Sequence, residues 1–424
     1  MKAVVFPSVV SGVVLAPPGK SLMQRACALA LLNNGVTRIF NPGKSEDDLA
    51  ALSIIQQLGA NVTEGKDFIE INSDGQIKGP ALLNCGESGL SCRMFAAIAA
   101  ISTQEVIIEG RGTLLKRPMH FFDEVFPQLG VDVKMTNGHL PMKLKGPLKQ
   151  QDISIDASGS SQYLTGLLFA LSAIAEKRLH INVTNLVSKP YIDLSLQMLK
   201  DFGYRITHQN YQQFAIEASD KKRRAINYTI EGDWSGAAFY LVAAAISGKV
   251  FIKGLNQNSY QADKAVLQVL KNAGIRYSET NDELLVYSTE QIKAFEFDAT
   301  DCPDLFPPLV VLALYAKGIS VVKGVSRLIG KESNRAESLK EVFTSLGGKI
   351  SIDNDLMYIS GNAELSGGEI DSFGDHRIAM AAAIAGLKAN GPVLIKNAGV
   401  IAKSFPGFYQ QLVLLGAQIE LINE

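Results

Sequence analysis

Apolar and polar residues follow a pattern that recurs about six times along the chain. Each copy begins with an apolar stretch of helical spacing, continues with a glycine, and ends in short strand-like runs around a polar turn. The glycines lie 69 to 73 residues apart, at Gly59, Gly130, Gly203, Gly274, Gly347 and Gly416. Such a glycine is typical of a helix end, where the backbone turns left-handed before a strand begins. The runs that follow it predict a β-hairpin.

The helical stretches upstream of the hairpins are apolar on almost every side. Residues 21–33, 89–100 and 160–175 are examples. Helices of this kind are buried, so we expect sheets to cover them. A period of about 70 residues is too long for a usual solenoid. The pattern therefore predicts an α/β fold of six repeated units in two groups of three, a two-domain inside-out α/β barrel with buried helices and outer sheets.

The length of the chain also favours two domains, because 424 residues exceed one ordinary domain and 47% hydrophobic residues supply large cores. Three copies of the repeat precede a Glu-Gly-Asp sequence at residues 231–233, and three follow it. We expect a first domain of residues 19–231. Residues 1–18 and 232–424 together would form the second domain, since the N-terminal strand must join a sheet. The crossings near Pro18 and Gly232 would then form a hinge.

Charge and composition exclude several classes of protein. The 41 Lys and Arg residues nearly cancel the 42 Asp and Glu residues, which leaves no overall field for nucleic acid or an anionic membrane. Pro7 interrupts the apolar start, and no uncharged apolar run reaches the roughly 18 to 20 residues of a membrane span. The four cysteines form no CxxC pair, and five scattered histidines give no metal-ligand spacing. We therefore expect a cytoplasmic protein without a metal, a nucleic acid or a membrane partner.

Two glycine-lysine-serine sequences resemble part of a phosphate-binding P-loop. Residues 19–21 follow a strand-like run and open a helix, but Val14 stands where the motif needs a further glycine. Residues 43–45 fail in the same way. A local anion site remains at the first sequence, because Lys20 adds a cation to the N–H groups of a helix N-terminus. Arg25 lies one helical turn beyond Ser21, on the same helix face.

Polar residues also stand at the start of other apolar helices. Arg93 lies within the stretch 89–100, where an unpaired guanidinium would be costly to bury. Residues 160–162 read Ser-Ser-Gln and either cap their helix or bind an oxyanion. Residues 375–377 read Asp-His-Arg before another apolar run. Charged and polar residues near the N-termini of several buried helices predict one polyanionic ligand.

The motifs occur in an order that resembles EPSP synthases, members of the enolpyruvyltransferase family, over nearly the full length. The family signature PGSKSxxxRA corresponds to PPGKSLMQRA, GNxGTxxR corresponds to GESGLSCR, and SKPYID is intact at residues 188–193. The other matches are Arg-Pro at 117–118, SSQxLT at 160–165, EGD at 231–233, PD at 303–304, KExxR at 331–335, DHR at 375–377 and AKxFP at 402–406.

The resemblance implies transfer of the enolpyruvyl group of phosphoenolpyruvate to the 5-hydroxyl of shikimate 3-phosphate. The products would be 5-enolpyruvylshikimate 3-phosphate and phosphate, in the shikimate pathway of aromatic amino-acid biosynthesis. It implies no cofactor, an active site in the cleft between the domains, and competition of glyphosate with phosphoenolpyruvate. We expect a monomer. Two phosphates and two carboxylates fit a site with many cations.

The site residues follow from the resemblance by matched position. Those implied for shikimate 3-phosphate, mainly in the first domain, are Lys20, Ser21, Arg25, Ser160, Ser161, Gln162, Ser188, Asp304 and Lys331. Those implied for phosphoenolpyruvate, whose site the second domain would complete, are Lys20, Gly89, Arg117, Gln162, Arg335, Arg377 and Lys403. Catalysis would rest on Lys20, Asp304 and Glu332, with Asp304 as candidate for removing the hydroxyl proton.

The chain departs from the family pattern at Pro18, Gly19, Glu87, Leu90, Arg327 and Asn334. Glu87 and Leu90 stand where the family usually has asparagine and threonine near phosphoenolpyruvate. Two alternatives stay open. A UDP-N-acetylglucosamine enolpyruvyltransferase would usually carry a reactive cysteine in the loop that here reads GRGTLLKRPM. A catalytically inactive anion-binding homologue should have lost Lys20, Asp304 or Glu332, and all three are present.

Overall fold

The computed structural model describes residues 1–220, 222–280 and 283–423, and the chain forms two compact units. The first, here called the continuous unit, comprises Pro18–Ile230. The second, the discontinuous unit, comprises Met1–Pro17 and Glu231–Glu424. Each unit has a hydrophobic core of its own.

The described residues of the continuous unit form three four-stranded sheets with a common plan. In each sheet an edge strand runs parallel to its neighbour, and the remaining pairs are antiparallel. The first sheet has the order β14 (Arg224–Thr229), β3 (Asn34–Phe40), β5 (Phe68–Asp74) and β4 (Asn61–Glu64). The second has β6 (Ala81–Asn84), β7 (Glu105–Glu109), β9 (His139–Lys145) and β8 (Asp132–Thr136). The third has β10 (Ile153–Asp156), β11 (Leu179–Thr184), β13 (Gln213–Ile216) and β12 (Ile206–Gln209).

The described part of the discontinuous unit repeats this plan three times. One sheet has the order β2 (Val10–Leu15), β15 (Gly248–Lys253), β17 (Glu283–Tyr287) and β16 (Tyr277–Glu279). The next has β19 (Glu296–Asp298), β21 (Ile319–Lys323), β23 (Leu356–Ser360) and β22 (Lys349–Asp353), and β18 (Ile292–Lys293) pairs separately with β20 (Ala316–Lys317). The last has β24 (Gly368–Asp371), β25 (Val393–Lys396), β1 (Lys2–Val5) and β26 (Ile419–Ile422). In this last sheet β1 takes the place that a second hairpin strand holds in the other five.

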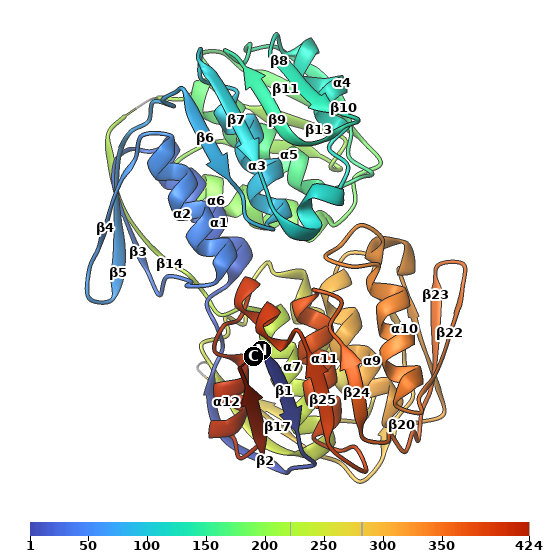
Figure 1. Cartoon of the computed structure of the whole chain (residues 1–424). Helices are drawn as coiled ribbons and strands as arrows, with labels where there is room; N and C mark the ends of the chain where they lie inside the picture. Colours follow the sequence, from blue (N-terminus) through green and yellow to red (C-terminus); the bar gives the residue numbers. More distant parts are fainter. Residues whose placement is uncertain (221, 281–282, 424) are drawn as a thin grey trace. The chain divides into compact units, whose positions relative to one another are not determined.

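Two helices belong to each repeat, one apolar and one partly exposed. The apolar helices are α1 (Lys20–Leu32), α3 (Gly89–Ala99), α5 (Ser161–Ile174), α7 (Trp234–Ser247), α9 (Phe306–Leu314) and α11 (His376–Gly386). Their companions are α2 (Glu46–Gln57), α4 (Phe121–Gln128), α6 (Lys189–Asp201), α8 (Val266–Asn272), α10 (Arg335–Ser345) and α12 (Phe408–Leu414). In Figure 1 the sheet of β3, β4 and β5 lies on the outer side of α1 and α2.

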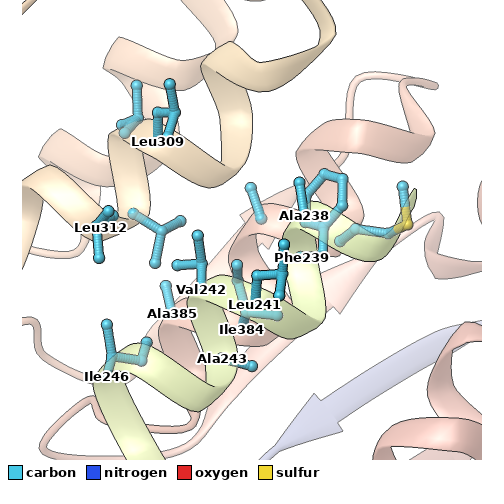
Figure 2. Close-up of a cluster of buried hydrophobic side chains, with 14 of the residues drawn as sticks. Ala238, Phe239, Leu241, Val242, Ala243, Ile246, Leu309, Leu312, Ile384 and Ala385 are labelled. Carbon is cyan, nitrogen blue, oxygen red and sulfur yellow. The ribbon is translucent and has the colours of Figure 1, made fainter. Parts of the chain in front are cut away.

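The core of the discontinuous unit forms where three apolar helices meet. Figure 2 shows Phe239 and Val242 of α7 facing Leu309 and Leu312 of α9, with Ile384 of α11 beside them. All five side chains are fully buried. Helices with apolar residues on every side gain most when other helices and a sheet enclose them. The predicted fold, with helices inside and sheets outside, is confirmed.

The six glycines that marked the repeat all have positive φ, between +72° and +110°. Each follows a helix and precedes a strand, so the predicted left-handed helix ends are confirmed. The hairpins β4–β5, β8–β9, β12–β13, β16–β17 and β22–β23 follow the first five of them.

Two further features are the length of the apolar helices and the state of the cysteines. Across the residues that the structure describes, no helix combines the length and the apolar character that a membrane crossing needs. The four cysteines are buried and form no disulfide. They serve as small apolar side chains in the cores.

Candidate active site

The first turns of α1, α3 and α5 in the continuous unit are joined by polar side chains. The hydroxyls of Ser88 and Ser91 donate to Oε1 of Gln24 at 2.8 Å and 2.9 Å. Nη1 of Arg93 donates to Oε1 of Gln162 at 2.8 Å. Three helix N-termini are thereby held together, and their backbone N–H groups and dipoles favour a bound anion.

Lys20 is the first residue of α1, and its side chain is held by a carboxylate. Nζ of Lys20 lies 2.8 Å from Oδ2 of Asp47, which belongs to the first turn of α2. The two side chains are 15% and 10% exposed, so neither is completely buried. Asp47 orients the cation, because a charge-assisted hydrogen bond is directional as well as strong.

Gly89 opens α3 and lies under two guanidinium groups. A Cβ atom built on Gly89 would be 2.9 Å from Nη1 of Arg117 and 2.9 Å from Nη1 of Arg93. Arg117 is only 6% exposed, and its Nη2 donates to Oγ1 of Thr113 at 3.1 Å. Two like charges that meet at a helix N-terminus form a strong site for an anion. Gly89, Arg117 and Gln162, all implied for phosphoenolpyruvate, therefore lie together.

Arg25 is almost completely buried within the continuous unit. It is 1% exposed, its Nε donates to Oγ of Ser195 at 2.9 Å, and its Nη1 donates to the carbonyl of Ser21 at 2.8 Å. Burial lowers the pKa of Arg25 to about 10, although the nearby Tyr191 and Tyr228 raise it. Arg25 thus joins α1 to α6, and its contact with a substrate stays a prediction.

The four predicted serines of this unit lie at helix starts, and Ser21 is the second residue of α1. Ser160 is the N-cap of α5, where its hydroxyl accepts from the backbone N–H of Gln162 at 3.2 Å. Ser161 is the first residue of that helix and is 5% exposed. Ser188 precedes α6 with φ +53°, a conformation that is uncommon for a residue other than glycine. The N-cap interpretation of Ser160 is confirmed, and oxyanion binding stays a prediction.

A second cluster of charged residues lies in the discontinuous unit around Arg335, the first residue of α10. Its Nη1 donates to Oδ1 of Asp304 at 2.8 Å, and its Nη2 donates to Oε2 of Glu332 at 2.6 Å. Its Nε donates to Oδ2 of Asp375, the N-cap of α11, at 2.9 Å. Arg335 is 1% exposed, and the three carboxylates raise its pKa above the usual value although burial lowers it. The guanidinium is thus a fixed cation that organises three acids.

Asp304 lies at the centre of this cluster. Besides Arg335, it accepts a hydrogen bond from Nη2 of Arg377 at 2.9 Å, and Nζ of Lys331 lies 3.7 Å from its Oδ1. Burial alone would raise the pKa of Asp304, but Arg377, Lys331 and Arg335 outweigh it and hold that pKa far below its usual value. Burial lowers the pKa of Lys331, and Asp304 partly offsets this effect. Asp304 is therefore ionised in this arrangement.

Arg377 and Lys403 complete the cluster. Arg377 lies in the first turn of α11, and its Nη2 donates to the hydroxyl of Ser235 at 2.8 Å as well as to Oδ2 of Asp304. Nζ of Lys403 donates to the carbonyl of Gly374 at 2.8 Å, directly before the start of α11. Asp304, Lys331, Glu332, Arg335 and Arg377 thus form one connected group, and Lys403 contacts the loop that precedes α11.

Some residues of the two clusters were not selected from the sequence. No sequence pattern marked Asp47 or Ser235 as a site residue, because their partners Lys20 and Arg377 are distant in the sequence. Asp375 was visible as part of the Asp-His-Arg motif, and its N-cap position before an apolar helix could have marked it.

Comparison with known proteins assigns the chain to a family. The family model EPSP synthase (3-phosphoshikimate 1-carboxyvinyltransferase) matches residues 5–412. A 3-phosphoshikimate 1-carboxyvinyltransferase of Clostridium perfringens is 36% identical over 98% of each chain. A protein with the same name from Aeropyrum pernix is 35% identical over 100% of this chain and 97% of its own.

A solved structure agrees with this assignment. The EPSP synthase of Acinetobacter baumannii superimposes with a TM-score of 0.82 at 25% identity, over 99% of this chain and 100% of the other. Sequence and structure thus match over the same nearly complete length. The chain belongs to the EPSP synthase family.

Proposed function

We infer that the chain transfers the enolpyruvyl group of phosphoenolpyruvate to the 5-hydroxyl of shikimate 3-phosphate. The products are 5-enolpyruvylshikimate 3-phosphate and inorganic phosphate. The observation that carries this function is the family match over residues 5–412 together with relatives of the same name at about 35% identity. A biosynthetic enzyme of this kind works in the cytoplasm, and we propose that location and a monomeric state.

We propose that both clusters act on one pair of substrates. The continuous unit would mainly hold shikimate 3-phosphate through Lys20 and the serines at the helix starts, and the discontinuous unit would complete the phosphoenolpyruvate site. Support comes from the anion-binding helix ends of the first cluster and from the guanidinium groups of both. Arginine suits these ligands because its planar fork matches carboxylates and phosphates.

The reaction needs two proton transfers before phosphate leaves. The 5-hydroxyl loses a proton as its oxygen bonds to C2 of phosphoenolpyruvate, and the methylene carbon C3 gains a proton. In the second step the tetrahedral intermediate loses a proton from C3 and releases phosphate, so the double bond forms again. Carboxylates in unlike surroundings can divide such work. We propose that Asp304 accepts the hydroxyl proton, that Glu332 transfers the proton at C3, and that Lys20 assists the leaving phosphate.

Asp304 can serve as this base only after its surroundings change. In the structure two guanidinium groups hold it ionised with a strongly lowered pKa, which makes it a weak proton acceptor. The carboxylate of phosphoenolpyruvate carries the same charge and geometry as the Asp304 carboxylate. We propose that it takes over the donors of Arg335 and Arg377, and that the pKa of Asp304 then rises towards the range of a useful base.

We also propose that the ligands draw the two units together. Cations are assigned to both units, and like charges repel until an anion neutralises them. Small-angle scattering should therefore show a smaller radius of gyration with shikimate 3-phosphate and a non-reacting phosphoenolpyruvate analogue than without them. Unchanged scattering at saturation would contradict closure.

The function is tested by measuring phosphate release from phosphoenolpyruvate with two acceptors. Shikimate 3-phosphate should support turnover, and UDP-N-acetylglucosamine should not. Turnover with UDP-N-acetylglucosamine but not with shikimate 3-phosphate would favour a UDP-N-acetylglucosamine enolpyruvyltransferase. No turnover with either acceptor would favour an inactive anion-binding homologue. Size-exclusion chromatography with light scattering on the same sample measures the oligomeric state.

A further inference from the structure

Glu87 lies directly before α3 and contacts the segment that leads to Arg117. It is half-buried, and its Oε2 accepts two hydrogen bonds from Thr113, one from the backbone N–H and one from the hydroxyl, each 3.0 Å long. Thr113 belongs to the 3-10 helix η1 (Gly112–Lys116). Two donors of one residue on one carboxylate oxygen fix the position of η1 relative to the start of α3.

The same contact fixes the direction of the Thr113 hydroxyl. A threonine hydroxyl has one hydrogen to donate and two lone pairs that accept. Because Thr113 directs its hydrogen to Glu87, a lone pair remains for Nη2 of Arg117, which donates to Oγ1 of Thr113 at 3.1 Å. Glu87, Thr113 and Arg117 thus form a chain of hydrogen bonds with a defined polarity, here called the Glu87 relay.

The far end of the Glu87 relay lies at the proposed phosphoenolpyruvate site. The other terminal nitrogen of Arg117, Nη1, lies 2.9 Å from the place of a Cβ atom on Gly89. At the near end, a Cβ atom on Gly112 would lie 2.4 Å from Cδ of Glu87, and Gly112 has φ +55°. A glycine at this position therefore leaves the room that the Glu87 carboxylate occupies.

We propose that Glu87 is a positioning residue for phosphoenolpyruvate, which acts by holding Arg117 through Thr113. The inference rests on the proposed function, in which Arg117 binds this substrate. A positioning role and a plain charge effect predict opposite results. A carboxylate near the site repels an anionic substrate, so its removal would tighten binding if charge alone mattered. Loss of the relay instead removes the bond between Thr113 and Arg117, which loosens the guanidinium and weakens binding.

The test is steady-state kinetics of Glu87→Ala, Glu87→Gln, Thr113→Val and the double variant Glu87→Ala with Thr113→Val. Glu87→Ala and Thr113→Val should each raise KM for phosphoenolpyruvate about 10-fold, the effect of losing one charge-assisted hydrogen bond. In both, kcat and KM for shikimate 3-phosphate should stay within about 3-fold of wild type. The double variant should be no worse than either single one, because both changes break the same chain.

Glu87→Gln separates geometry from charge. Its side-chain oxygen can accept both bonds from Thr113, so KM for phosphoenolpyruvate should return to within about 3-fold of wild type. Glu70→Ala is the matched control, since Glu70 is also half-buried in the continuous unit and bonds to one residue, Arg38. It should leave all constants unchanged.

An unchanged or lowered KM for phosphoenolpyruvate in Glu87→Ala, or additive effects in the double variant, would overturn the proposal. If Glu87→Ala does not fold, Thr113→Val against Thr113→Ser carries the same test, because serine keeps the hydroxyl. Failure of the underlying function is recognised separately. The wild type would then show no turnover with shikimate 3-phosphate, or Arg117→Ala would leave KM for phosphoenolpyruvate unchanged.

Discussion

Nη1 of Arg335 lies 2.8 Å from Oδ1 of Asp304. The second oxygen of the same carboxylate is 2.9 Å from Nη2 of Arg377. Asp304, which we assign to proton transfer, therefore accepts hydrogen bonds from Arg335 and Arg377, the two residues that we assign to the substrate carboxylate. We therefore expect substrate binding and proton transfer to be coupled, because a substrate carboxylate that takes over the two arginines would also release Asp304 from them.

Replacement of Asp304 by alanine should lower turnover by at least about 10²-fold, the lower end of a general acid–base contribution. This change is measured as the steady-state rate of phosphate release at saturating concentrations of both substrates. Asp298→Ala is a suitable control, since Asp298 is a more exposed aspartate of the same unit that is paired with Lys323. Near wild-type turnover of Asp304→Ala would reduce Asp304 to a binding residue.

Glu332→Ala should also lower turnover by at least about 10²-fold, while the cluster itself persists. Arg335 keeps the carboxylates of Asp304 and Asp375 in this variant, so its charge remains neutralised. We expect KM values to change less than kcat. A variant with normal kcat would remove Glu332 from the proton transfers and leave them to Asp304 and Lys20.

Lys20→Met should lower turnover by at least about 10²-fold, because methionine is an unbranched side chain only one atom shorter than lysine but carries no charge. Asp47→Asn should have a smaller effect, since it weakens the orientation of Lys20 without removing the cation. Lys44→Met, at an exposed position of the same unit, is the control. Equal kinetics of Lys20→Met and the control would contradict a role of Lys20 in the reaction.

Gly89→Ala should raise KM for phosphoenolpyruvate more than KM for shikimate 3-phosphate. The new methyl group would be 2.9 Å from the tips of Arg93 and Arg117, so both flexible side chains must move. We also expect glyphosate to compete with phosphoenolpyruvate in the wild type and to inhibit this variant less. Inhibition that is non-competitive with phosphoenolpyruvate would contradict the assigned site.

Asp48→Asn should reduce the pH dependence of stability. Burial raises the pKa of Asp48 to about 7, although bonds from Ser45 and the charge of Lys20 lower it. The folded chain binds this proton more tightly than the unfolded chain, whose aspartates titrate near about 3.9. The stability that the proton contributes is therefore complete below about pH 4 and is lost as the pH rises to about 7.

The measurement is the free energy of unfolding in denaturant at pH 5 and pH 8. Wild type should lose about 3 kcal/mol more than Asp48→Asn between these pH values. The carboxamide oxygen can still accept from the backbone N–H and the hydroxyl of Ser45, so the N-terminus of α2 should stay capped. Equal losses in both proteins would show that Asp48 does not titrate in this range.

The repeat could be predicted from the sequence because its signals are local. A helix end such as Gly203 needs positive φ whatever surrounds it, and the apolar character of α7 is visible in a run of consecutive residues. The contacts within the site could not be predicted in this way. Asp304 meets Arg377 only because the chain returns after 73 residues, and no local pattern encodes that distance. The resemblance named both residues but not their bond to each other.

The sheet of β24, β25, β1 and β26 has a consequence for how the chain folds during its synthesis. Ala3 pairs with Ile395 on one side and with Leu421 on the other, so β1 can form these pairs only after residues at least about 390 positions later have been synthesised. The continuous unit consists of Pro18–Ile230, so we expect it to fold while the rest of the chain is still being translated. The discontinuous unit can complete this sheet only after β25 and β26 have emerged from the ribosome, and we expect this step to be slow because the paired strands are far apart in the sequence.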